Sequence, residues 1–279
     1  MLSAIGSVFN LFFMAPLANG LAVSYKLFGQ NLGVAIVVFS IFLRVALNPL
    51  TKPYMKSMKE VKKYASEVEK IKKRHKGSPA KAAQAQRDFY KTKGINPAAG
   101  LLPFILQFVF LIAFFRVFTS ILADNGSIVE SFNGLLYDPI KFSTDAVIKT
   151  KFLYLDVTEP DRFALAGLPF PVPGPVLLLA AAVQFLSSRL AVPYVKEEKR
   201  IAEKTKEKRD DIQVAMQSSL SYTFPIITIV FGMSFPSGLA LYWLLFSLFQ
   251  FYQQYANYGW GGLTPWIGRL GLIRLPNEG

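Results

Sequence analysis

Long apolar runs alternate with shorter polar segments along this chain, and the runs are longer than the core helices of most soluble domains. Five of them approach the roughly 17 to 25 residues that a helix needs to cross the hydrocarbon core of a membrane. They are Leu32 to Leu50, Leu101 to Leu122, Pro175 to Pro193, Leu220 to Phe235 and Leu239 to Tyr255. The pattern predicts an all-α integral membrane protein with five transmembrane helices.

The polar segments between these runs divide the chain further. The predicted divisions are an N-terminal interfacial amphipathic helix (1–28), a first span (29–50), a cytoplasmic basic helical hairpin (51–99), a second span (100–123), an extracytoplasmic loop (124–173), a third span (174–193), a cytoplasmic loop (194–217), a fourth span (218–235), a fifth span (237–256) and a cytoplasmic tail (257–279).

The first 28 residues are apolar too, but they lack the basic start of a secretory signal. Asn10, Pro16, Asn19 and Gly20 interrupt them. We therefore expect an interfacial helix here, and a sixth spanning helix is the alternative.

The segment 51–99 has helical periodicity despite its charge. Its apolar residues recur every three or four positions before and after a "GSP" turn at residues 77–79, which predicts two helices. They are Met55, Met58, Val61, Tyr64 or Ala65, Val68 and Ile71, and then Ala82, Ala85 and Phe89, with Gly94 at the end. The charged outer faces suit either a solvated spacer near anionic lipid headgroups or a docking site for a protein or for ribosomal RNA.

Charge fixes the expected orientation. The chain carries a net charge of +13, and residues 51–99 hold 14 Lys and Arg against 4 acidic residues. Residues 124–170 hold 4 basic residues against 7 acidic ones, so the positive-inside rule places them outside and the hairpin in the cytoplasm. Five spans then put the N-terminus outside and the C-terminus in the cytoplasm. The chain has no cysteine, which excludes disulfides, thiolate nucleophiles and cysteine-bound metals.

One arginine interrupts the first apolar run. Arg44 keeps its charge, so something must solvate it inside a span. Ser40, Arg44 and Asn48 are four residues apart and form one stripe of the helix. Counted from the cytoplasmic ends of their spans, Gln107, Ser187 and Gln250 lie at about the depth of Arg44, on the order of 8 to 9 Å into the inner leaflet. This polar layer predicts a hydrated groove closed toward the outside.

The alternative for Arg44 is snorkelling, in which the side chain extends to the headgroups. We expect this of Arg116 and Arg189, which lie nearer the ends of their spans.

Three stretches then resemble a known family. They are "FSIFLRVALNPLTKPYMKSMKEV" (39–61), "GINPAAGLLPFILQFVFLIAFFRVF" (94–118) and "FPSGLALYWLLFSLFQFYQQY" (235–255). Together they resemble the membrane protein insertases of the bacterial YidC, mitochondrial Oxa1 and chloroplast Alb3 family, over nearly the whole chain. The expected segment before the first span and the expected tail are both short, which resembles the short bacterial type.

The resemblance implies an insertase of the bacterial inner membrane, which moves short hydrophilic segments of nascent membrane proteins across the bilayer. It implies no enzymatic activity, cofactor, metal or small-molecule substrate. The expected partners are nascent clients, anionic lipids and possible contacts with the ribosome and the Sec translocon. Arg44, Tyr242 and Trp243 match the family's motifs, and either Gln184 or Ser187 corresponds to its polar groove residue in the third span.

Two other functions are weighed against this one. A small anion transporter or channel could use Arg44, but it favours internal repeats, polar residues near the midplane and a route on both sides. The sequence has no internal repeat and no polar layer in the outer leaflet. An intramembrane protease is excluded on chemistry, because the one histidine, His75, lies in a predicted loop and no span contains Asp, Glu or Cys.

Overall fold

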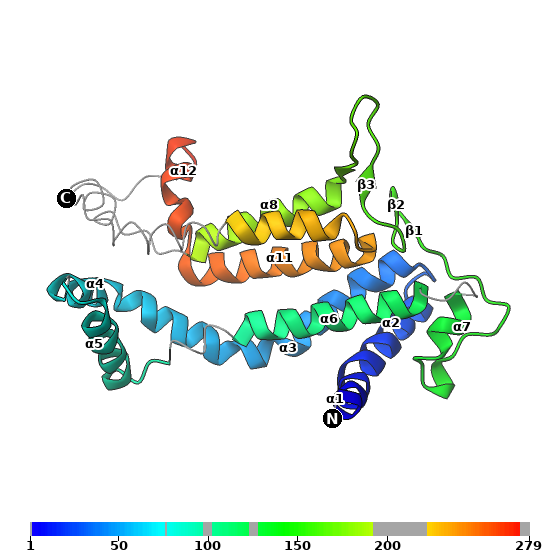
Figure 1. The fold of residues 1–279 in the computed structure, drawn as a ribbon, viewed down its shortest axis with the longest axis horizontal. Helices are drawn as coiled ribbons and strands as arrows, with labels where there is room; N and C mark the ends of the chain where they lie inside the picture. The colour runs from blue at the N-terminus through cyan, green and yellow to red at the C-terminus, as the bar shows by residue number, and fades with distance from the viewer. Residues whose placement is uncertain (1, 76, 97–101, 123–127, 192–221, 274–279) are drawn as a thin grey trace.

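The computed structural model describes residues 2–75, 77–96, 102–122, 128–191 and 222–273, and in these ranges the chain is mostly helical (Figure 1). The predicted cytoplasmic loop 194–217 lies outside the described residues. So does the last part of the predicted tail.

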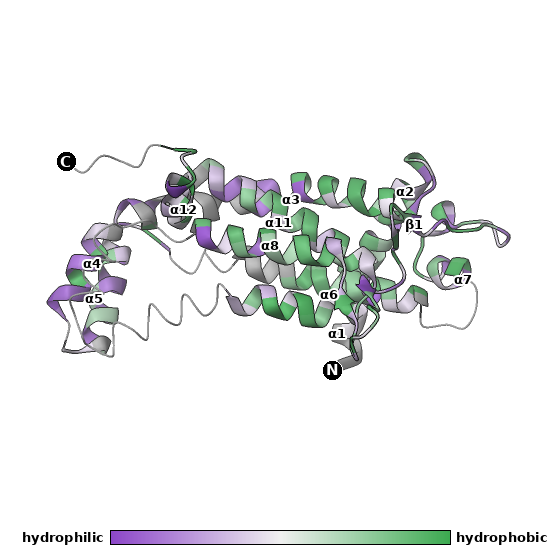
Figure 2. Ribbon diagram, turned by 90° about the horizontal axis from the view of Figure 1, so that it is seen from above, coloured by the Kyte–Doolittle hydropathy of each residue, from purple (hydrophilic) through white to green (hydrophobic). Residues whose placement is uncertain are grey.

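Long apolar helices form the body of the molecule. They are α3 (Leu32–Lys63), α6 (Leu102–Leu122), α8 (Pro175–Ala191), the helix Tyr222–Gly232 and α11 (Ser237–Tyr258). Figure 1 shows α3, α6, α8 and α11 running along the longest axis. In Figure 2 hydrophobic residues predominate along the body of the bundle, and hydrophilic residues gather at the end where α4 and α5 lie. Large side chains of α6 and α11 meet in the core, where Phe114 stacks on Tyr242.

Length and composition single out two candidate membrane spans among the described residues, Gly6–Leu27 and Leu32–Pro49. Shorter apolar helices cover Phe108–Ile121, Pro175–Leu190 and Tyr222–Gly232. The helical class of the protein agrees with the sequence, while the count of five spans stays a prediction.

The first long helix does not end where the predicted span ends. α3 continues past residue 50 to Lys63, through Pro49 and Pro53. Each proline removes one backbone hydrogen bond of the helix. A long helix can continue past a proline when neighbouring groups satisfy the freed carbonyl. The predicted border between span and hairpin is thus a change in polarity within one helix.

Two shorter helices follow α3. α4 (Ala65–Arg74) and α5 (Pro79–Thr92) pack through Val68, Tyr90 and Ile95. Ser78 caps α5, since its hydroxyl accepts a hydrogen bond from the Lys81 amide at 3.5 Å. The basic residues of α4 and α5 therefore belong to two helices that pack on each other.

The N-terminal segment is helical throughout, as α1 (Leu2–Phe9), a π-helical turn (Asn10–Met14) and α2 (Ala15–Leu27). Both views show it crossing the long helices at a steep angle (Figures 1 and 2). Its inner face packs on α3, and Gly20 has no room for a Cβ because Phe39 occupies that space. The choice between an interfacial helix and a sixth span remains a prediction.

The connection between α6 and α8 contains α7 (Ile128–Asn133), a 3-10 turn (Asp138–Ile140) and two short antiparallel strand pairs. β1 (Lys151–Phe152) pairs with β2 (Leu155–Asp156), and β3 (Arg162–Phe163) pairs with β4 (Val172–Pro173). These strands add a small β component that the apolar runs do not indicate.

This connection also fixes where α8 and α11 begin. The buried Asp161 carboxylate accepts hydrogen bonds from the Leu177 amide at 2.8 Å and from the Tyr154 hydroxyl at 3.1 Å. It thereby satisfies a free amide at the start of α8. Burial raises the pKa of Tyr154 to about 12, so its phenol stays a donor at neutral pH. At the start of α11, the Ser237 amide donates to the Glu159 carbonyl at 2.7 Å.

The chain ends, among the described residues, with a 3-10 turn (Gly261–Leu263) and α12 (Thr264–Arg269). The predicted cytoplasmic tail is therefore helical in its first part.

Candidate functional site

Arg44 lies between α3 and α11, where it is half-buried. Its Nη2 donates a hydrogen bond to Oε1 of Gln253, and its guanidinium carbon lies 4.7 Å from the centre of the Phe246 ring. A guanidinium over an aromatic face gains electrostatic stabilisation that a lipid tail would not provide. The Arg44 guanidinium is thus held against α11 by a hydrogen bond and a ring contact.

Gln253 connects two residues of the predicted stripe. Its Nε2 donates to Oδ1 of Asn48 at 3.3 Å, while its Oε1 accepts from Arg44. Because Oε1 accepts one of these bonds and Nε2 donates the other, they fix which way the Gln253 amide points. We call Arg44, Asn48, Phe246 and Gln253 the arginine cluster.

The arginine cluster has a simple helical origin. Arg44 and Asn48 are one turn apart on α3, and Phe246 and Gln253 are two turns apart on α11, so each pair lies on one face. Gln250 lies between the latter two and is half-buried.

The other predicted site residues have different surroundings. Ser40 is buried, and its hydroxyl donates to the Ile36 carbonyl of its own helix at 2.6 Å. Tyr242 and Trp243 are buried in α11. The Tyr242 ring centre lies 4.5 Å from that of Phe114 and 6.2 Å from that of Phe246, so Tyr242 adjoins the arginine cluster. Gln107 is part of α6, but its side chain lies outside the described part of the structure.

The two alternatives in α8 have different surroundings. Ser187 is buried against α11, and its hydroxyl donates to the Ser247 carbonyl at 3.3 Å. Gln184 is half-buried, and its Oε1 accepts from the Thr228 hydroxyl at 2.7 Å. Ser187 joins α8 to α11, and Gln184 joins α8 to the helix Tyr222–Gly232. These hydrogen bonds lead to α11 and to the helix Tyr222–Gly232. Which of the two residues serves a groove stays a prediction.

Sequence reasoning missed Gln253 and Phe246. The signal was present in the spacing, since Phe246, Gln250 and Gln253 recur at intervals of four and three residues. This spacing does not by itself identify the partner of Arg44. The rotation of α11 about its axis, which depends on its packing against α3, decides which of its polar residues contacts Arg44.

Toward the other end of α3 and α11 the packing is tight and apolar. A Cβ on Gly238 would lie 2.5 Å from the Phe118 ring and 2.9 Å from Cδ1 of Ile36. Phe114, Phe118 and Leu239 are almost completely buried there. The arginine cluster thus adjoins a dry layer on one side.

The two arginines expected to snorkel both contact aromatic rings. The Arg116 guanidinium carbon lies 5.5 Å from the centre of the Phe9 ring, and Arg189 is surrounded by three rings.

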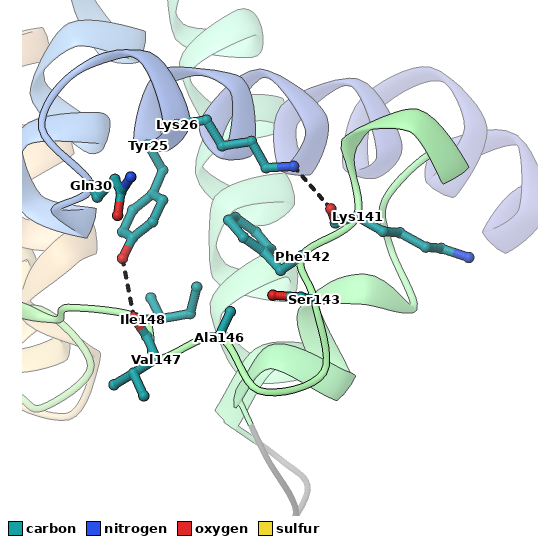
Figure 3. A pocket seen from close by; sticks show the side chains of 9 residues that line it. All are labelled: Tyr25, Lys26, Gln30, Lys141, Phe142, Ser143, Ala146, Val147 and Ile148. Atoms are coloured by element: carbon teal, nitrogen blue, oxygen red, sulfur yellow. Dashed lines mark hydrogen bonds between the residues drawn. The ribbon is translucent and has the colours of Figure 1, made fainter.

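A pocket of about 330 Å³ lies near the start of α3, far along the bundle from α4 and α5 (Figure 3). Nζ of Lys26 donates to the Lys141 carbonyl at 2.9 Å, and the Lys141 side chain points away from the pocket. The Lys141 ammonium lies 2.7 Å from the Asp138 carboxylate. Both charged groups of the pocket therefore have partners, which makes the arginine cluster the stronger candidate for a functional site.

Comparison with known proteins adds independent information. A family model described as "60Kd inner membrane protein" matches residues 23–260. The membrane protein insertase YidC of Fusobacterium nucleatum is 31% identical over 227 residues, which cover 81% of this chain and 85% of the relative. YidC 2 of Bacillus anthracis is 26% identical over 252 residues, which cover 89% and 80%.

Longer relatives match as well. YidC of Syntrophobacter fumaroxidans is 28% identical over 255 residues, which cover 91% of this chain but only 39% of the relative. The predicted family is confirmed by these matches. The helices that carry the arginine cluster, α3 and α11, lie within the matched range, and the chain belongs to the 60Kd inner membrane protein family, whose relatives here are named YidC membrane protein insertases.

Proposed function

We propose that this protein is a membrane protein insertase that accepts short hydrophilic segments of nascent clients in a groove beside the arginine cluster. The observation that carries the proposal is the position of Arg44, half-buried between two apolar helices and oriented by Gln253. The names of its relatives support the same function.

The expected mechanism is a shortened barrier. A polar segment that crosses a membrane loses its hydration over the whole hydrocarbon thickness. A hydrated groove that reaches the depth of Arg44 would shorten that distance. The dry packing around Gly238 would keep the groove closed on the far side.

Arg44 would attract acidic residues of the client's tail. A membrane potential that is positive outside then favours outward movement of each negative charge by about 2.3 kcal/mol per 100 mV. The client's apolar helix leaves the protein because its burial in lipid is favourable. Neither step requires a nucleotide, a metal or a small-molecule substrate.

The lipid-exposed faces of α8 and α11 would guide that helix. Leu178 and Leu179 are 46% and 51% exposed on α8, and Leu248 and Tyr252 are 42% and 67% exposed on α11. Together with the charge distribution, these surfaces support the proposed third and fifth spans. Contacts with the ribosome and the Sec translocon would fall to the hairpin and the loop 194–217.

Reconstitution with crosslinking tests the function. In vesicles that contain the purified protein, a client with one apolar helix and a short tail should insert, and its tail should become protected from added protease. A photoreactive residue at Leu179 or Tyr252 should crosslink to the client helix. The matched control is Leu153, which is 82% exposed but lies in the loop. Tail protection that is equal without the protein, or crosslinking that is equal from position 153, would overturn the proposal.

The proposed topology has a separate test. Single cysteines at Ser78 and Ser143, in a protein without native cysteine, should react with a membrane-impermeant reagent from opposite sides. Ser78 lies between α4 and α5, so we expect labelling only from the cytoplasm, and Ser143 should be labelled only from outside. Labelling of both positions from one side would contradict the five-span arrangement.

A further inference from the structure

The C-terminal part of the described chain turns sideways at the end of the bundle. Figure 1 shows α12 running across the direction of α11, at the end of the molecule where α4 and α5 lie. A helix that runs across the axis of a transmembrane bundle at its end lies close to the membrane plane. α12 is therefore positioned at a membrane surface in any orientation that places α11 across the bilayer.

A set of rings around Arg189 holds α12 in this position. The Arg189 guanidinium carbon lies 5.1 Å from the centre of the Trp266 ring, 5.7 Å from that of Phe185 and 5.8 Å from that of Tyr222. Trp266 belongs to α12, Phe185 to α8 and Tyr222 to the helix Tyr222–Gly232. A single cation thus joins three separate helices through attraction to their ring faces.

The other side of the segment is open and apolar. Trp266 is 41% exposed although one face of its ring meets Arg189, and Leu270 and Leu272 are 71% and 73% exposed. Arg269 is the one charged residue between positions 259 and 273, so the segment is basic as well as apolar.

We propose that residues 264–273 form a lipid-binding surface in the headgroup region, with Trp266 and the two leucines in the upper acyl chains and Arg269 at anionic headgroups. Tryptophan prefers this depth because its ring is apolar and its N–H is polar. Segments with apolar residues on one side and basic residues nearby bind anionic membrane surfaces. The basic hairpin at the same end adds attraction for such lipids.

This surface is separate from the arginine cluster and from the proposed movement of clients. Its role is to set the height of α8 in the membrane, because Arg189 links α8 to the segment that contacts the headgroups. A protein partner would be a different occupant, and a reconstituted system without other proteins separates the two.

Fluorescence quenching by brominated lipids tests the proposal in the full-length protein. The chain has three tryptophans, so Trp243→Phe with Trp260→Phe leaves Trp266 as the single fluorophore. In vesicles, lipids brominated near the headgroup should quench Trp266 more strongly than lipids brominated at the chain end. Brominated lipids with anionic headgroups should be enriched around it, and Arg269→Gln should reduce this enrichment by up to about fivefold, the effect of one basic residue at an anionic surface.

A difference measurement guards against a folding defect in the double variant. The quenching lost on Trp266→Phe in the otherwise unchanged protein reports the same site, and Phe at this position can still pack on Arg189. Quenching of Trp266 by soluble iodide and not by either brominated lipid would overturn the proposal, because the segment would then face water. Equal enrichment of anionic lipid before and after Arg269→Gln would overturn the role of Arg269. Neither readout depends on insertase activity.

Discussion

Arg44→Ala should lower the insertion of clients with acidic translocated tails by about tenfold or more, because a hydrogen bond to a charged group contributes about 1.5–3 kcal/mol. The guanidinium is the charged group of the arginine cluster, and its loss removes the attraction for a carboxylate that enters the groove. Arg44→Glu should reduce insertion further, since it repels the same carboxylates.

Two clients that differ only in the charge of their tails distinguish attraction of acidic residues by Arg44 from a structural role of Arg44. When the acidic residues of the tail are replaced by their amides, Arg44→Ala should insert nearly as well as the parent protein. Insertion is measured at equal abundance of each variant in the membrane. A loss that is equal for acidic and neutralised clients would mean that Arg44 mainly maintains the packing of α3 on α11.

Arg44→Lys distinguishes charge from geometry. Lysine keeps the positive charge and can still lie over the Phe246 ring, but it lacks the planar group of five donors. We expect insertion of acidic clients to stay within about threefold of the parent, a cost of less than 1 kcal/mol. Near-parent insertion of every client by Arg44→Ala would instead favour a snorkelling side chain without a role in transport.

The apolar helices could be predicted from the sequence because a continuous run of apolar residues is enough to indicate each of them. A run of apolar residues that must bury its backbone groups in lipid has only the helix available to it. This argument locates α6, α8 and α11 to within a few residues. It fails at the end of α3, because a helix can continue from lipid into water when its backbone bonds do not change, and residues 51–63 are polar but still helical.

The partners of polar side chains could not be predicted in the same way. The spacing of four residues places Ser40 in a polar stripe with Arg44. A buried serine can instead donate its hydroxyl to the carbonyl four residues earlier in its own helix, and Ser40 does so. Depth alone predicts that Ser187 belongs to a polar layer with Arg44. Its hydroxyl donates to a backbone carbonyl of α11, a partner that depth does not indicate.

Gln253 illustrates the missing information. Three glutamines, at positions 250, 253 and 254, lie near the end of α11, and depth favours Gln250. The structure brings Gln253 to Arg44 because α11 packs on α3 with the face that contains Phe246. The rotation of one helix about its axis depends on contacts along its whole length, which no local pattern encodes.

Because Arg44 of α3 and Gln253 of α11 are hydrogen-bonded, we expect that exchanging the two residues can supply the guanidinium from α11 instead of α3. Arg44→Gln should reduce insertion of acidic clients by about tenfold, as Arg44→Ala does, because the charge is lost. Gln253→Arg alone should reduce the amount of folded protein, because it places two guanidinium groups at hydrogen-bonding distance in a partly dry site. Combining the two substitutions restores one guanidinium and one amide between the same helices, with Asn48 still available as an acceptor.

We therefore expect the double variant to recover both abundance and insertion of acidic clients to within about threefold of the parent, a residual cost below 1 kcal/mol. The remaining loss reflects the contact with Phe246, which a guanidinium two turns away on the same helix cannot make as well. Gln253→Leu is the control that removes the acceptor without adding charge. If the double variant stays as defective as Arg44→Gln while its abundance recovers, the groove needs its positive charge on α3, and the orientation of Arg44 matters more than the field it creates.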